Sequence, residues 1–227
     1  MDNQLLALMI TAAGLGFVHT LLGPDHYIPF IALAKAGKWT IKKTSVITGI
    51  CGLGHIASSF FIGILVIKLS HSFTGLQTFE SFRNNVAGWL LISFGMVYMI
   101  WGIKKIFREK NKNRITEVLQ NDSSKRDTNR SGNHHLLAWI LFVIFIFGPC
   151  EPLIPLIMFP AANINLMALI MVAAVFGLTT ILTMLIVVIL TVYGINKITT
   201  PFTGIYNNAL AGMLILICGI GMQFLGL

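Results

Sequence analysis

The sequence predicts an all-α integral membrane protein with six transmembrane helices, arranged as two inverted three-helix repeats whose helices 1 and 4 are broken at Gly-Pro pairs. The composition, the length of the apolar segments and an internal repeat lead to this prediction. Of 227 residues, 56% are hydrophobic and only 11% are charged. That is too little charge to solvate a globule of this size, so we expect a membrane protein.

Six apolar stretches are long enough to cross a hydrocarbon core of roughly 30 Å. They cover about residues 5–33, 44–67, 86–106, 136–159, 166–192 and 207–227. The first stretch follows Asp2 without a preceding Lys or Arg, unlike a secretory signal peptide, and we expect it to be retained.

The basic residues predict the orientation of the chain. Fourteen of the sixteen fall in alternate loops, and only Lys68 and Arg83 fall on the other side. The fourteen are Lys35, Lys38, Lys42, Lys43, Lys104, Lys105, Arg108, Lys110, Lys112, Arg114, Lys125, Arg126, Arg130 and Lys197. The positive-inside rule places loops 1, 3 and 5 in the cytoplasm and both termini outside, in a cell (inner) membrane. This asymmetry explains the net charge of +8 without a nucleic-acid partner.

An internal repeat divides the chain into two halves. Gly23-Pro24 recurs 125 residues later as Gly148-Pro149, and glycines of the third apolar stretch recur in the sixth at an offset of 124. We therefore predict a first repeat over 1–106, a polar cytoplasmic linker over 107–133 and a second repeat over 134–227. The glycine faces are expected to pack helices within the protomer.

Three crossings per repeat make the two halves run in opposite directions through the membrane. Inverted repeats with helices broken near the midplane are typical of secondary transporters, whose substrate site lies at the repeat interface. Gly23, Pro24, Gly148 and Pro149 are the predicted breaks, because proline lacks the backbone N–H and clashes with the preceding turn.

Ionisable side chains inside the apolar segments are the candidate functional residues, since such groups are expensive in lipid. The expected ligands are His19, Asp25, His26, His55, Cys150 and Glu151. Hydroxyl groups expected to line the same site are Ser58, Ser59, Thr179, Thr180 and Thr183. No Lys or Arg belongs to this set, which argues against an anionic substrate.

A mixture of imidazole, carboxylate and thiolate suits a borderline divalent metal such as nickel, cobalt, zinc, iron or copper. Magnesium and calcium prefer oxygen ligands throughout. We expect the metal to be the transported substrate, exchanged for protons, with no organic cofactor and no enzymatic activity.

The residues His19, Asp25-His26 and Leu53-Gly54-His55 resemble the signatures of nickel/cobalt transporters of the NiCoT type. The spacing of His19 from Gly23-Pro24-Asp25-His26 is more similar to that of UreH-like urease accessory and sulfite-exporter-like membrane proteins. By this resemblance His19, Asp25, His26 and His55 are metal ligands, and the protein transports a divalent transition metal.

A second resemblance is to membrane electron transporters of the cytochrome c biogenesis type, which have six helices in two inverted halves and a Pro-Cys element in each. Pro149-Cys150 fits one half, whereas Asp25 stands where the other cysteine is expected. A two-thiol relay therefore requires Cys51 or Cys218 as the partner. A third alternative is an assembly factor that delivers metal or partner proteins to an enzyme such as urease.

Overall fold

The computed structural model describes residues 3–70, 73–118, 132–148, 156, 166–197, 204 and 206–225. Within these ranges the chain forms helices and no strand. The elements are α1 (Asn3–Leu22), the 3-10 turn η1 (Pro24–His26), α2 (Ile28–Ala36), α3 (Ile41–Ser70), α4 (Phe73–Val118), α5 (Gly132–Phe147), α7 (Leu166–Lys197), α8 (Asn207–Ile220) and the π-helical turn η2 (Gly221–Leu225).

Among the described residues, five helical segments are long and apolar enough to cross a membrane. They are Asn3–Leu22, Ile41–Ile62, Ser81–Asn111, Met167–Ile195 and Asn207–Leu225. The described part of the fourth predicted segment is a shorter apolar helix, Leu136–Phe147, and residues 149–155 lie outside the described ranges. The chain is thus an all-helical, multi-pass membrane protein, and its sixth crossing stays a prediction.

Helix α4 is longer than the third apolar stretch at both ends. Its 46 residues correspond to about 70 Å at 1.5 Å per residue, more than twice the hydrocarbon thickness. Residues 107–118, expected to belong to the polar linker, continue this helix. The basic half of α4 therefore extends beyond the lipid.

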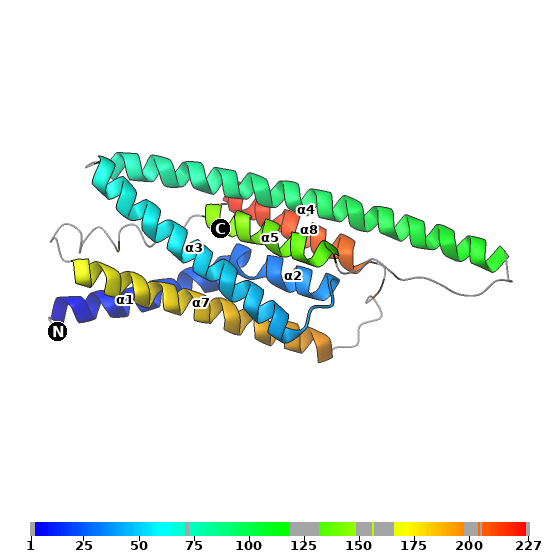
Figure 1. The fold of residues 1–227 in the computed structure, drawn as a ribbon, viewed down its shortest axis with the longest axis horizontal. Helices are drawn as coiled ribbons and strands as arrows, with labels where there is room; N and C mark the ends of the chain where they lie inside the picture. Colours follow the sequence, from blue (N-terminus) through cyan, green and yellow to red (C-terminus); the bar gives the residue numbers. More distant parts are fainter. Residues whose placement is uncertain are drawn as a thin grey trace.

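The helices pair between the two halves of the chain (Figure 1). Helix α1 packs on α7, α3 packs on both α5 and α7, and α4 packs along α8. The short helix α2 lies inside the bundle against α7 and α8, with Phe30 and Leu33 fully buried. The main core cluster therefore joins α2 and α3 to α5, α7 and α8.

Glycines allow the closest of these contacts. A Cβ on Gly52 of α3 would lie 3.2 Å from the Ile181 side chain of α7, and a Cβ on Gly177 of α7 would lie 2.7 Å from that of Ile56 on α3. Adding 125 to positions 52 and 56 gives 177 and 181, so each contact repeats the other with the two halves exchanged.

The α4–α8 pair shows the same exchange at an offset of 124. A Cβ on Gly95 would meet the Leu216 backbone, and a Cβ on Gly219 would meet the Ile92 backbone. The predicted packing of the glycine faces within the protomer is thus confirmed for these two helices.

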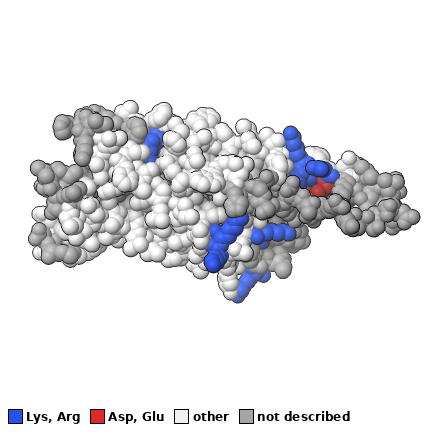
Figure 2. All heavy atoms as spheres, in the orientation of Figure 1, with Lys and Arg blue, Asp and Glu red and all other residues white. Residues whose placement is uncertain are grey.

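Exposed basic side chains gather toward the end where α3 begins and α7 ends (Figure 2). Three lysines there lie over aromatic rings of their own helix or its preceding turn: Lys43 over Trp39, Lys105 over Trp101 and Lys197 over Tyr193. Aromatic residues with flanking lysines are typical of a membrane–water boundary.

Candidate functional site

The first Gly-Pro pair lies where α1 stops. Gly23 is extended, with φ −87° and ψ 93°, and Pro24 then opens the 3-10 turn. A Cβ on Gly23 would lie 2.7 Å from His26 Nδ1 and 2.9 Å from Asp25 Oδ1. A side chain at this position would therefore displace His26 and Asp25 from their present places against the Gly23 backbone.

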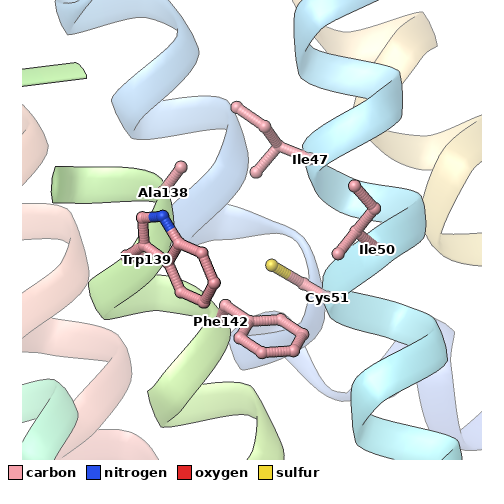
Figure 3. A pocket seen from close by; sticks show the side chains of 6 residues that line it. All are labelled: Ile47, Ile50, Cys51, Ala138, Trp139 and Phe142. Carbon is pink, nitrogen blue, oxygen red and sulfur yellow. The ribbon is translucent and has the colours of Figure 1, made fainter. Parts of the chain in front are cut away.

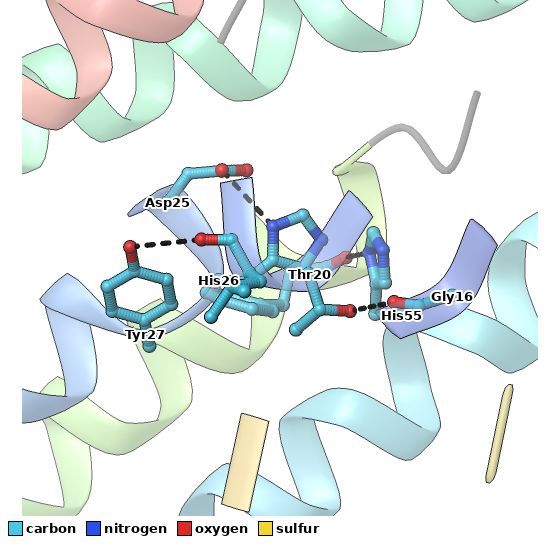
Figure 4. A network of polar contacts seen from close by, with 8 residues as sticks. Gly16, Thr20, Asp25, His26, Tyr27 and His55 are labelled. Atoms are coloured by element: carbon cyan, nitrogen blue, oxygen red, sulfur yellow. Dashed lines mark hydrogen bonds and ion pairs between the residues drawn. The ribbon is translucent and has the colours of Figure 1, made fainter. Parts of the chain in front are cut away.

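This turn brings the polar residues of the first half together (Figure 4). His26 Nδ1 lies 3.1 Å from Asp25 Oδ1. The ring centroids of His19 and His26 are 4.8 Å apart, and those of His26 and His55 are 5.4 Å apart. The four residues predicted from the first half thus form one cluster, in which His26 and His55 are each only 2% exposed.

Hydrogen bonds orient His55. Its Nδ1 lies 3.1 Å from the carbonyl oxygen of Phe145 on α5. A carbonyl can only accept, so Nδ1 carries a proton and the neutral ring presents Nε2 as an acceptor. The Nε2 atoms of His19, His26 and His55 are all buried and have no hydrogen-bond partner among the described residues.

The structure adds a residue that the sequence analysis left out of the site. Arg83 of α4 is 2% exposed and donates to the carbonyl oxygens of Ile146 at 3.1 Å and Gly148 at 2.9 Å. The same nitrogen lies 3.3 Å from Ser58 Oγ and 3.4 Å from Ser59 Oγ. Its guanidinium therefore supplies donors at the C-terminal end of α5, where helical carbonyls lack partners.

This finding corrects the expectation that the site holds no cation and that Arg83 belongs to an outer loop. The argument against an anionic substrate, which relied on the absence of a buried cation, is therefore wrong. The sequence feature that could have indicated this role is the position of Arg83, which lies three residues, or about one helical turn, before the third apolar stretch. Only the packing of α4 on α3 and α5 turns that side chain inward.

The predicted hydroxyl lining divides into two groups. Ser58 and Ser59 join the site through Arg83, and Ser58 also donates to Ile146 O at 2.8 Å. In α7, Thr179 and Thr183 donate to carbonyls one turn earlier in their own helix. Thr180 is fully buried, its Oγ1 has no partner among the described residues, and it lies against Gly16 of α1.

A cavity of about 20 Å³ lies at the centre of the site. It is lined by Asp25 and His26 of η1, His55 of α3, Gly148 after α5, Met222 of η2 and apolar residues of α4 and α5. This is room for one water molecule. The two halves of the chain therefore meet here.

Both cysteines in the described ranges are free and buried. Cys51 precedes the cavity-lining His55 by one turn of α3, and Cys218 precedes the cavity-lining Met222 by four residues at the end of α8. Cys51 also faces a larger apolar cavity between α3 and α5 (Figure 3). The predicted residues Pro149, Cys150 and Glu151 lie outside the described residues, and Gly148 is the last one before them.

The described residues contain no group of three or more His, Cys, Asp or Glu side chains placed to hold a metal ion. The rings of His19, His26 and His55 meet edge to face, with interplanar angles of 81° and 87°. Zinc-type ligands surround one metal ion at about 2 Å, an arrangement that is not found among the described residues.

A comparison with protein-family models matches most of the chain. The family model described as "Cytochrome C biogenesis protein transmembrane region" matches residues 29–221. No curated protein and no solved structure matches the chain. The match supports the second of the two resemblances noted in the sequence, and the nickel/cobalt and UreH-like resemblance is not shown.

Proposed function

The chain belongs to the family of cytochrome c biogenesis protein transmembrane regions, and from this premise we propose that it carries reducing equivalents across the membrane by thiol–disulfide exchange. The family match over most of the chain carries the proposal. Cys51 and Cys218, each four residues from a residue that lines the central cavity, support it.

The proposed exchange has two balanced steps. A protein dithiol on one side reduces an intramolecular disulfide, giving two cysteine thiols and a donor disulfide. Those two thiols then reduce a protein disulfide on the other side, and the intramolecular disulfide forms again. Each step moves two electrons and two protons, and each proceeds through attack of a thiolate on a disulfide sulfur.

Cys150 is the proposed exchanging thiol, with Cys51 or Cys218 as its partner. Cys150 follows the cavity-lining Gly148 by two residues, and the candidate partners each precede a cavity-lining residue by four positions. A disulfide needs Cα atoms about 4.4–6.8 Å apart. Rocking of one half against the other is the motion we propose for bringing the thiols into reach.

The proposed scaffold for this motion is six membrane helices in two inverted repeats, broken at both Gly-Pro pairs. Contacts that recur with the halves exchanged, such as Gly52 with Ile181 and Gly177 with Ile56, are what a two-fold relation between repeats requires. The end of α1 before Gly23 and of α5 before Gly148 further supports it.

Thiol trapping tests the redox proposal. The purified protein is reduced or oxidised, quenched in acid and labelled with a maleimide that adds mass to each free thiol. We expect oxidation to remove two labelled thiols from the wild type and none from Cys150→Ala. Cys51→Ala and Cys218→Ala identify the partner, since only one of them should prevent the disulfide. Three labelled thiols in the oxidised wild type contradict the proposal.

Passage of a divalent transition metal is the second candidate, favoured by the three buried imidazole Nε2 atoms without partners among the described residues. Elemental analysis of protein purified without chelators separates the two. A stoichiometric metal lost in His26→Ala supports metal passage, and a metal-free protein with a reversible Cys150 disulfide supports thiol exchange.

A further inference from the structure

An apolar cavity of about 230 Å³ lies between α3 and α5, away from the central site (Figure 3). It is lined by Ile47, Ile50 and Cys51 of α3 and by Ala138, Trp139 and Phe142 of α5. Ile50 and Trp139 are 53% and 65% exposed. Both helices are apolar, so a bilayer surrounding them would bring lipid to the mouth of the cavity.

Helix α3 carries a lysine one helical turn before the first lining residue of this cavity. Lys43 precedes Ile47 by four residues and Ile50 by seven, so the three lie on one face of α3. The Lys43 Nζ lies 5.2 Å from the centre of the Trp39 ring. Its charge is thus held at the membrane boundary, about one helical turn from the apolar lining.

We propose that this cavity and Lys43 form a binding site for an anionic phospholipid, with one acyl chain in the cavity and the headgroup phosphate at Lys43. The lining accepts a hydrocarbon chain, and its volume is below the roughly 300–1,000 Å³ of sites for whole small molecules. The neighbouring Lys42 adds a second positive charge at the headgroup level.

The proposed lipid site and the central cluster share helix α3. Cys51, whose side chain faces the cavity in Figure 3, is one turn from His55 of the central cluster. A bound chain would cover the Cys51 thiol. Cys51 is only 1% exposed, so its alkylation requires α3 and α5 to separate locally, and a bound acyl chain should slow that reaction further. This measurement does not depend on any redox activity.

Alkylation of Cys51 by N-ethylmaleimide tests the proposal. The reduced protein in mild detergent is treated alone, with phosphatidylglycerol or with phosphatidylcholine, and modification of the Cys51 peptide is followed by mass spectrometry against the Cys218 peptide. We expect phosphatidylglycerol to slow Cys51 alkylation about fivefold more than phosphatidylcholine does, the preference expected for one lysine near an anionic headgroup.

Three variants separate the contribution of the headgroup from that of the acyl chain. Lys43→Gln should remove the preference for phosphatidylglycerol, while Lys197→Gln, which removes another lysine lying over an aromatic ring, should retain it. Ala138→Phe should fill the cavity and slow alkylation without lipid. Equal protection by both lipids, no protection by either, or equal effects of Lys43→Gln and Lys197→Gln would overturn the proposal. The wild-type lipid comparison decides it even where a variant fails to fold.

Discussion

Arg83 is a buried cation whose donors satisfy the end of another helix. The carbonyls of Ile146 and Gly148 accept from it, and no water is available in lipid to replace it. Hydrogen bonds to charged groups contribute about 1.5–3 kcal/mol each. The residue therefore stabilises the end of α5 and contacts Gly148, which lines the central cavity.

We expect Arg83→Met to lower the free energy of unfolding by about 1.5–3 kcal/mol, because the Gly148 carbonyl loses its Arg83 donor while the Ile146 carbonyl still accepts from Ser58. Arg83→Lys should recover part of the loss, since an ammonium can still donate. Arg108→Met, at an exposed position of the same helix, is the control. Thermal unfolding in detergent measures all three, and equal midpoints for Arg83→Met and Arg108→Met would count against this role.

The hydrogen bond of His55 can be tested by comparing two amide substitutions at this position. Its Nδ1 bonds to Phe145 O, and an asparagine amide nitrogen can occupy nearly the same place. His55→Asn should therefore retain more stability than His55→Gln, by about 1 kcal/mol for one retained hydrogen bond. Thermal midpoints that are equal, or ordered the other way, would show that this bond does not hold α3 to α5.

Glycines set the approach of α4 to α8 at the element scale. A Cβ on Gly212 would overlap backbone atoms of Met99, whereas a Cβ on Gly49 of α3 meets nothing within 4 Å. A neighbouring backbone cannot move aside as a flexible side chain can, so overpacking here forces the helices apart.

Gly212→Ala should destabilise the protein by about 1–3 kcal/mol. Gly49→Ala should be neutral or slightly stabilising, because alanine is the better helix former by about 1 kcal/mol. Both variants are compared by thermal unfolding in the same detergent. A destabilised Gly49→Ala, or an unchanged Gly212→Ala, would mean that α4 and α8 do not pack through this contact.

The whole molecule has one basic end, and this predicts its orientation. Lys42 lies at that end, and Ser81 lies near the opposite end of the bundle at the start of the α4 membrane span. With loops 1, 3 and 5 in the cytoplasm, an impermeant thiol reagent applied to intact cells should label Ser81→Cys and spare Lys42→Cys, both in a cysteine-free background. Disrupted cells should label both, and the reverse pattern in intact cells would invert the proposed topology.

Much of the fold could be predicted because few backbone structures are stable in lipid. Apolar segments of sufficient length must form helices, since every backbone group has to be satisfied within the segment. The end of α1 at Leu22, before Gly23-Pro24, agrees with the missing N–H of proline. The helical extension through residues 107–118 could not, because the sequence there is polar and composition alone does not distinguish a projecting helix from a loop.

The candidate site was predicted in part. His19, Asp25 and His26 are close in sequence, and the turn at Gly23-Pro24 determines that they meet. His55 was expected to join them and does. Arg83 was missed because the direction of a side chain near a membrane boundary depends on which helix covers it.

The sequence by itself determined the class of the protein, its apolar helices and the paired Gly-Pro elements, because these follow from chain-local properties and the cost of polar groups in lipid. The tertiary structure decided which polar groups share one site: it set His55 against Phe145, turned Arg83 inward and brought Gly148 and Met222 of the second half to the cavity lined by Asp25 and His26. Which side chains meet depends on contacts between helices that are far apart in the chain. The local sequence does not specify how those helices pack against one another.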